Sequence, residues 1–369
     1  MPLIGVQLQP GYMNKLDRYI IKQFLGTFFY AIIILAVITA VIDYSEKVDD
    51  FVKRQAPWGE ILNYYKNFIP YMVAFLFPLF IFIATIFFTS KLAYRSEIIA
   101  ILSSGVSYTR FMRPYLIGGA FLCVVSLLAN HWIVPAANKQ RLAFEDTYVH
   151  EATVASDRNV HLRLSNDLYV YIQSYDYLVN TGYRFTAERI VGEQLVEKIM
   201  AERISYDSAK KTWELHNVTI RRNNGLQEEL ILEAGLKRKY PFTPGDLKLD
   251  NDNMTAMTTP VLNKVIAREK LRGRENLNQF YVEKHRRTAQ PFAGLILTVI
   301  GVTIASKKVR GGSGLHLAFG IMISAAYILA LQFSTTFSTK AGLNPLLAAW
   351  IPNIIFAFVA LHFYRKQVR

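Results

Sequence analysis

Residues that could carry catalysis are few in this sequence. There are seven histidines, none at helical ligand spacing from another, and Cys123 is the one cysteine. A thiolate metal site or an intramolecular disulfide needs several cysteines, and a zinc site needs clustered nitrogen or sulfur ligands. No G-x-S-x-G nucleophile elbow occurs either. The sequence therefore disfavours a metal site and catalysis by this chain alone.

A glycine-rich stretch, Gly311-Gly312-Ser313-Gly314, has the composition of a phosphate-binding loop. No G-x-x-x-x-G-K-[ST] occurs in the chain, so the lysine that a P-loop places on nucleotide phosphates is missing. The stretch closely follows Lys307 and Lys308, and we interpret it as a basic turn between two apolar runs. We predict no nucleotide site and no cofactor in this chain.

Composition and the placement of charge indicate a membrane protein. Hydrophobic residues make up 52% of the chain, and the formal net charge is +14. The basic residues cluster at the ends of apolar runs, where anionic lipid headgroups attract them. This placement fits a membrane better than nucleic acid, and we predict no nucleic-acid partner.

Six apolar runs approach or exceed the roughly 20 residues that a helix needs to cross a bilayer. They cover residues 24–42, 68–90, 115–134, 288–306, 314–339 and 343–364. The first is too long for the apolar core of a signal peptide, so we predict an uncleaved span. Pro70 and Pro78 predict kinks in the second run. Asn130, Gln332 and Asn353 fit helix–helix hydrogen bonds better than ion sites.

Between the third and fourth runs the pattern changes to strict alternation. Leu168, Val170 and Ile172 alternate with Tyr169 and Tyr171, which is typical of strands with one buried face. Residues 207–211 and 223–225 have the composition of hairpin turns, and 203–206 and 213–215 would be the two sides of one hairpin. Residues 138–259 are predicted to form an inserted all-β domain, a sandwich or jellyroll-like fold.

The predicted fold is an α-helical integral membrane protein with six transmembrane helices and this β domain inserted between helices 3 and 4. Residues 1–137 would hold helices 1–3, residues 138–259 the β domain, and residues 288–369 helices 4–6. Residues 260–287 are strongly charged and helical in pattern, and would form a connecting helix.

An amphipathic segment at residues 91–105 lies between the second and third runs. Its apolar residues fall mostly on one side of a helix, with Arg95 and Glu97 off that side, and Gly105 ends it. Pro114 opens the next run. A surface helix tied to a span at each end can transmit a push into the bilayer, whereas an ordinary interfacial helix is the alternative. The apolar residues are Leu92, Ile98, Ile99, Ile101 and Leu102.

The positive-inside rule orients the six spans. The short segments on the side of the termini carry clearly more Lys and Arg than the opposite loops, so the termini and residues 91–105 are predicted to be cytoplasmic and the β domain periplasmic. The first set is Lys15, Arg18, Lys22, Lys91, Arg95, Arg110, Arg113, Lys307, Lys308, Arg310, Arg365, Lys366 and Arg369. The opposite set is Lys47, Lys53, Arg54, Lys66 and Lys340.

Charge-poor spans would enclose a greasy cavity that suits a lipid tail. Basic residues near its outer mouth are candidates for holding acidic or phosphorylated lipid headgroups. The alternative is that they are solvated loop charges. These residues are Lys47, Lys53, Arg54, Lys139 and Arg141.

Two segments resemble signatures of the YjgP/YjgQ permease family, the lipopolysaccharide export permeases LptF and LptG. Arg95-Ser96-Glu97, continuing through Ser104-Gly105-Val106-Ser107 to Arg113-Pro114, resembles the family's "R-S-E-…-G-[IV]-S-…-P" signature. The segment with Glu283, His285, Arg287 and Pro291 resembles "E-x-H-[RK]-[RK]-x-x-x-P" at the start of span four. Leu16-Asp17-Arg18-Tyr19-Ile20 is similar to the usual start of the first helix. With the order of spans, the resemblance covers essentially the whole chain.

The resemblance implies a transmembrane permease subunit of an ABC-type complex in the inner membrane of a Gram-negative bacterium. Its partners would be a second permease of the family, a cytoplasmic ABC ATPase dimer that binds the ATP, periplasmic jellyroll bridge proteins, membrane lipids and lipopolysaccharide, in a pathway of outer membrane biogenesis. Residues 91–105 would be the coupling helix, with Glu97 as the coupling carboxylate and Arg95 supporting it. Lys47 is the nearest match to the family's lipid-contacting residue, although Glu46 and Asp49 dilute its charge.

Two other functions remain open from the residues alone. A secondary transporter or channel for another lipid or amphiphile would work without an ATPase, but such carriers usually need ionisable groups at membrane depth. A non-transporting envelope scaffold would tolerate bulky residues in the predicted cavity.

Overall fold

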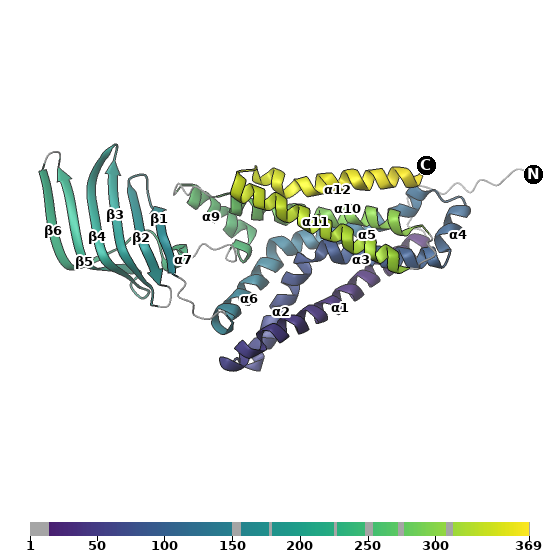
Figure 1. Cartoon of the computed structure of the whole chain (residues 1–369), viewed down its shortest axis with the longest axis horizontal. Coiled ribbons are helices and arrows are strands. Elements are labelled where there is room, and N and C mark those ends of the chain that lie inside the picture. Colours follow the sequence, from purple (N-terminus) through teal and green to yellow (C-terminus); the bar gives the residue numbers. More distant parts are fainter. Residues whose placement is uncertain are drawn as a thin grey trace, which may run out of the picture. The chain divides into compact units, whose positions relative to one another are not determined.

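A computed structural model describes residues 15–149, 156–176, 179–224, 227–247, 254–271, 277–307 and 313–368 (Figure 1). Its contacts divide the chain into two compact units. The helical unit comprises Met1–Glu46, Tyr65–Ala137 and Val282–Arg369. The sheet unit comprises Lys47–Tyr64 and Asn138–Tyr281. The predicted basic turn at residues 308–312 lies outside the described residues, as does Arg369.

Among the described residues, six helical segments are long and apolar enough to cross a membrane, so the prediction of six spans is confirmed. Each of these helices continues beyond the apolar run that predicted it. They are α1 (Lys15–Lys53), α3 (Phe77–Tyr94), the continuous segment of α5 (Tyr108–Leu128), η1 (Ala129–Ile133) and α6 (Val134–Tyr148), then α10 (Asn278–Ala305), α11 (Ser313–Ala341) and α12 (Pro345–Val368).

The prediction of a single kinked helix for the second span, residues 68–90, was wrong. It is two helices, α2 (Trp58–Phe75) and α3, separated by Leu76. Pro78 lies in the first turn of α3 and has no N–H to donate to the Ala74 carbonyl four residues earlier. The side-chain amide of Gln290, in α10, supplies that hydrogen bond at 2.8 Å. A neighbouring helix therefore satisfies the carbonyl that proline leaves free, as spanning helices require.

Two boundaries around the β domain also differ from the prediction. Residues 138–148 lie in the sheet unit but are helical, as part of α6, and their buried positions, including Asn138, Leu142 and Glu145, recur at helical spacing. The predicted connecting helix at 260–287 is interrupted: α9 (Thr259–Leu271) ends before α10 starts, and residues 272–276 lie outside the described part.

The helical unit has a tightly packed aromatic core. Phe24 on α1, Phe77 on α3 and Tyr115 on α5 are almost fully buried in one cluster. Glycines permit this close approach: a Cβ on Gly294 would lie 2.6 Å from the ring of Phe77, and one on Gly118 would lie 2.8 Å from the ring of Phe24. In the described structure α11 packs against both α3 and α12.

Polar contacts between spans are confirmed for one of the three predicted residues. Asn353 on α12 accepts from the Tyr327 hydroxyl on α11 at 2.8 Å and donates to the Ala289 carbonyl on α10 at 2.7 Å. Gln332 is exposed on α11. Asn130 is buried within η1, and its amide nitrogen has no hydrogen-bond partner among the described residues.

The inserted domain is one six-stranded antiparallel sheet in which consecutive strands are neighbours (Figure 1). The predicted all-β insertion is confirmed. The Tyr206–Trp213 pair lies in register across β4 and β5, as the predicted hairpin requires, and Asp207 closes the turn by accepting from the Ala209 and Lys210 N–H groups. The strands are β1 (Ser156–Arg163), β2 (Leu168–Asp176), β3 (Thr181–Val191), β4 (Gln194–Asp207), β5 (Thr212–Asn224) and β6 (Gln227–Arg238).

One face of the sheet carries the core predicted from the alternation. Val170 and Ile172 are buried on it, together with Trp213. The Trp213 indole N–H donates to the Phe242 carbonyl at 2.9 Å, and the two rings stack with centroids 4.6 Å apart. The segment after β6, with the short α7 (Pro244–Leu247), thus covers the end of the sheet where β4 and β5 turn.

One carboxylate links the last three strands of the sheet. Glu197 on β4 accepts from Arg222 on β5 and from Arg238 on β6, each at 3.3 Å. Burial raises the pKa of the Glu197 carboxyl, but hydrogen bonds and charge from the two guanidinium groups outweigh burial, so this pKa lies below its usual range.

The depressed pKa of Glu197 predicts acid sensitivity in this part of the sheet. The stabilisation is present above the unfolded carboxyl pKa of about 4.3 and is lost as the pH falls through the lower folded value. Hydrogen–deuterium exchange of β4–β6 in the full-length protein, corrected for intrinsic rates, should show falling protection below about pH 4. Glu197→Gln should flatten this profile, whereas Glu233→Gln on an exposed site of β6 should leave it unchanged. An unaltered profile in Glu197→Gln would contradict the assignment.

The Gln290 amide should be needed to hold the break between α2 and α3. Gln290→Leu removes the donor and leaves the Ala74 carbonyl without it, which should lower the free energy of unfolding by about 1–3 kcal/mol. Denaturant unfolding in lipid–detergent micelles measures this loss. The matched control is Gln332→Leu, which makes the same change on an exposed surface, and equal losses in both variants would exclude the capping role.

Candidate functional site

The segment predicted as a helix at residues 91–105 is divided by a sharp turn. α3 extends to Tyr94, Arg95 caps it, and Ser96 takes a left-handed conformation with φ 61°. The helix α4 then runs only from Glu97 to Ser103. Gly105 follows with φ +88°, a conformation that favours glycine, as predicted for the end of this helix. α4 is thus a short helix set off from α3 at a defined corner.

α4 presents an exposed surface with one anchored edge. Ile98 is 1% exposed and belongs to the core of the helical unit, whereas Ile99 is 52% exposed. Ile98 and Ile99 thus differ in exposure although both were counted among the residues mostly on one side, because consecutive residues of a helix point roughly 100° apart. Tyr94, at the end of α3, is exposed as well. Such apolar side chains beside charged ones suit a protein partner.

The predicted coupling residues lie together at the start of α4. Arg95 and Glu97 are 3.9 Å apart at their charged groups, and the Arg95 side chain is 56% exposed. The Tyr19 hydroxyl, in the first turns of α1, donates to Glu97 at a long 3.4 Å. These are weak contacts that a stronger partner can replace. Glu97 is therefore placed where a cationic group from another protein can reach it.

The predicted headgroup residues separate into paired and exposed ones. In the sheet unit the Lys47 ammonium contacts the Tyr64 hydroxyl at 2.6 Å and Glu145 at 2.8 Å. Arg141 donates to both oxygens of Glu145, at 2.9 and 2.8 Å, and to Asn138. The structure thus brings Lys47 and Arg141 together on one carboxylate.

The other three predicted headgroup residues do not join this cluster. Arg54 donates to the Thr147 carbonyl at 3.0 Å, at the end of α6. Lys53 and Lys139 are exposed. Of the five predicted headgroup residues, two therefore share the Glu145 carboxylate and three lie outside this cluster.

Glu145 is the residue that sequence reasoning missed in this cluster. Its side chain is 7% exposed and receives hydrogen bonds from Lys47, Arg141 and Tyr64. The signal was the i,i+4 spacing from Arg141 to Glu145, which pairs opposite charges on a helix. This helical spacing was overlooked because the segment that contains Arg141 and Glu145 was predicted to belong to the β domain. The Lys47–Arg141–Glu145 cluster carries a formal charge of one positive unit.

The third predicted motif forms a compact ion cluster on α10. Arg286 donates twice to one oxygen of Glu283, at 3.1 and 2.6 Å, and Arg287 donates to the other at 2.8 Å. His285 is half-buried, and Pro291 lies in the helix one turn on. The two arginines and the glutamate satisfy one another inside the helical unit, which indicates a positioning role for this motif.

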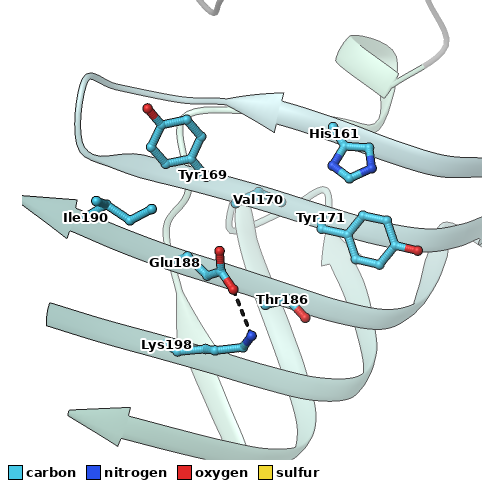
Figure 2. A pocket seen from close by; sticks show the side chains of 8 residues that line it. All are labelled: His161, Tyr169, Val170, Tyr171, Thr186, Glu188, Ile190 and Lys198. Carbon is cyan, nitrogen blue, oxygen red and sulfur yellow. Dashed lines mark ion pairs between the residues drawn. The ribbon is translucent and has the colours of Figure 1, made fainter. Parts of the chain in front are cut away.

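A shallow hollow of about 530 Å³ with a mixed polar and apolar lining lies on the face of the sheet opposite the core (Figure 2). The rings of His161, Tyr169 and Tyr171 project from β1 and β2, and the Glu188–Lys198 ion pair of 2.8 Å borders them. Cross-strand registry explains the arrangement, since His161 faces Tyr171 and Tyr169 faces Glu188. The sequence analysis did not single out these residues as a site.

Acidic, histidine and cysteine side chains do not gather into a cluster that could hold a metal ion within the described part of the chain. The polar groups described above instead form ion pairs and hydrogen bonds.

Comparison with known proteins gives one consistent result. The family model described as "Lipopolysaccharide export system permease LptF/LptG" matches residues 18–366. The chain is 20% identical over 349 residues to the lipopolysaccharide export system permease protein LptG of Haemophilus influenzae, covering 93% of this chain and 96% of that protein. The match spans both units.

Removing the charge of Glu145 should destabilise the cluster around it. Glu145→Gln leaves Lys47 and Arg141 half-buried without their shared anion, so the free energy of unfolding should fall by about 3–5 kcal/mol. Chemical unfolding in micelles tests this, with Glu46→Gln, at an exposed site of the same helix as Lys47, as the control. A loss no larger than that of the control would show that the cluster contributes nothing to stability.

Proposed function

Because the chain belongs to the LptF/LptG family of lipopolysaccharide export permeases, we propose that it extracts lipopolysaccharide from the outer leaflet of the inner membrane and passes it to a periplasmic bridge. Family membership makes the chain a multi-pass inner-membrane protein and a non-catalytic subunit of an ABC transporter, whose ATPase is a separate chain that binds the ATP. What we propose beyond family membership is the path of lipopolysaccharide, the residues that couple it to ATP hydrolysis, and the particular partner proteins.

The geometry of α4 is the observation that carries the proposal. A subunit without a nucleotide site needs a surface on which an external motor can act. α4 offers an exposed apolar side chain, Ile99, and an accessible carboxylate, Glu97, while Ile98 anchors the helix in the core. We assign the ATPase dimer to this surface, with Glu97 receiving a cationic group of the ATPase and Arg95 flanking it.

Charge at one end of the helical unit supports a cytoplasmic position for α4. Asp17 at the start of α1 pairs with Arg110 at the start of α5, and Tyr364 near the end of α12 meets Thr109. These contacts place the start of α1, α4 and the end of α12 at the same end, as six spans require. Among the described residues, the basic side chains assigned above to the cytoplasmic side lie on the segments at this end, which faces the cytoplasm under the positive-inside rule.

In the sheet unit, the Lys47–Arg141–Glu145 cluster is the proposed receptor for a phosphorylated lipid headgroup. Lys47 and Arg141 are preorganised by Glu145, yet the cluster retains a net positive charge. A phosphate that displaces part of the Glu145 contact gains charge-assisted hydrogen bonds from both cations. Lys53 and Lys139, exposed nearby in the sequence, add to the field that attracts anionic headgroups.

The sheet is proposed to continue the path in the periplasm. Its outer strands, β1 and β6, each have one neighbour among the described strands, so their free edges can pair with strands of jellyroll bridge proteins. A second permease of the family would complete the membrane half of the complex. The lipid-facing side chains of α1 and α12 give such a subunit a large apolar surface to contact.

Site-specific photo-crosslinking combined with Glu97→Ala tests the coupling assignment. A probe at position 97 should capture the ATPase, and a probe at position 47 should capture lipopolysaccharide. Glu97→Ala should abolish lipopolysaccharide export in cells while the complex still assembles and purifies intact, because the change removes two weak contacts, with Arg95 and Tyr19, and no core packing. Ser103→Ala, on an exposed site of the same helix, is the matched control and should export normally.

Three results would each refute a part of this proposal. Normal export by Glu97→Ala at native expression would remove Glu97 from coupling. A well-expressed protein whose position 97 captures no ATPase would remove α4 as the docking surface. Capture at position 97 without lipid capture at position 47 would leave the coupling assignment in place and reject the Lys47–Arg141–Glu145 cluster as the headgroup receptor.

A further inference from the structure

Three consecutive residues directly after α4 contact three different spans. Tyr108 meets Ser306 at the end of α10 at 3.3 Å, and Thr109 meets Tyr364 of α12 at 2.9 Å. Arg110 reaches Asp17 of α1. The loop between α4 and these residues is short, and Ser107 fixes its end by accepting from the Arg110 backbone N–H at 3.3 Å. A displacement of α4 is therefore passed to the first turn of α5, besides α3, which α4 follows in the chain.

The three contacts differ greatly in strength. Arg110 and Asp17 form two parallel hydrogen bonds of 2.7 and 2.6 Å between opposite charges, and Asp17 is 4% exposed. The contacts of Tyr108 and Thr109 are single bonds between neutral hydroxyl groups. Charge-assisted bidentate pairs are roughly twice as strong as neutral bonds and resist rotation. Of the three spans, α1 is thus the one tied most firmly to the α4–α5 junction.

α1 is also held at the other end of α4. Tyr19, two residues after Asp17, donates to Glu97, the first residue of α4, at 3.4 Å. The start of α1 therefore touches α4 at its beginning and the α5 turn just beyond its end. The two contacts are unequal, since the Tyr19 bond is long and exposed whereas the Asp17 pair is short and buried.

α1 is the span with the least packing inside this chain. Only 11% of its apolar window is buried, against 72% for α3 and 61% for α10. Ile20, Phe24 and Phe28 pack the start of α1 into the core, but most of its apolar window is exposed, so a movement of α1 breaks fewer contacts within the chain than a movement of α3 or α10 would. The strongest link from the α4 region leads to the helix that is easiest to move.

We infer that Asp17 and Arg110 are positioning residues that make α1 move with α4, and that Tyr19 is an exchangeable contact released when a partner engages Glu97. The inference rests on the proposed docking of the ATPase at α4. The Asp17–Arg110 pair persists through the cycle and transmits the displacement, while the loss of the Tyr19–Glu97 bond lets the start of α4 shift toward the partner.

The test uses the assembled complex in lipid vesicles with lipopolysaccharide and measures ATP hydrolysis, lipopolysaccharide released per ATP, and capture of the ATPase by a probe at position 97. Asp17→Asn should keep ATPase capture and near-normal hydrolysis but release at least about fivefold less lipopolysaccharide per ATP, the lower range for coupling between sites. Arg110→Lys, which keeps the charge but loses the paired geometry, should give an intermediate loss. Arg113→Gln, an exposed arginine on the same helix, is the control.

A distance measurement separates coupling from simple stabilisation. Spin labels at positions 22 and 100, both exposed on α1 and α4, should keep one narrow distance across nucleotide states in the parent protein. In Asp17→Asn the distribution should broaden when ATP is bound. If the complex with Asp17→Asn fails to assemble, the double variant Asp17→Arg with Arg110→Asp tests the inference instead. It restores the ion pair with the charges exchanged, so it should restore both assembly and lipopolysaccharide release per ATP.

The outcomes distinguish the inference from the proposal on which it rests. No ATPase capture at position 97 in the parent protein would overturn the docking proposal and this inference with it. Normal capture together with unchanged release per ATP and an unchanged distance in Asp17→Asn would overturn the inference alone. If the double variant assembles but does not recover lipopolysaccharide release per ATP, the Asp17–Arg110 pair has only a structural role, and the inference is overturned.

Discussion

Hydrocarbon offers no water to a free backbone group, and this constraint governs every irregularity in the helical unit. The chain interrupts its second span at Leu76, where Pro78 removes a donor, and the Gln290 amide from α10 restores the bond. Close by in the sequence, the Ala289 carbonyl accepts from Asn353 of α12. Two consecutive residues of α10 therefore bind two other helices. The short region before Pro291 holds the bundle together with hydrogen bonds that are fixed in direction, whereas apolar packing alone would let helices rotate and slide.

Ionised groups follow the same logic in both units. Glu145 gathers Lys47 and Arg141, Glu283 gathers two arginines, and Asp17 binds Arg110 in a paired geometry. In each case a carboxylate of low exposure organises longer basic side chains, so that the guanidinium and ammonium groups lose little further freedom when they act on something else. The contact between Arg95 and Glu97 is longer and more exposed than these three, and it occurs on the surface assigned to a partner.

Sequence reasoning identified features with a strong local period and missed those that depend on distant partners. The six apolar runs and the alternation around Val170 and Ile172 fix spans and strands because burial acts on each segment separately. The break at Leu76 was not predicted, since two prolines in one apolar run are compatible with a single kinked helix. Glu145 was lost when its helical segment was assigned to the β domain. The pairing of Asp17 with Arg110 joins residues 93 positions apart, and neither residue carries a local sign of the other.

Strand order in the inserted domain has a consequence for how the protein is made. Every pairing in the sheet joins strands that are adjacent in the chain, from β1 to β6, and the covering residue Phe242 comes soon after the last strand. Such local pairings require only short loop closures, which keeps contact order low and folding fast. The sheet can grow one hairpin at a time while the rest of the chain is still being synthesised. It can therefore be complete before the last three spans are synthesised, so that the domain does not need the finished membrane bundle as a template for its fold.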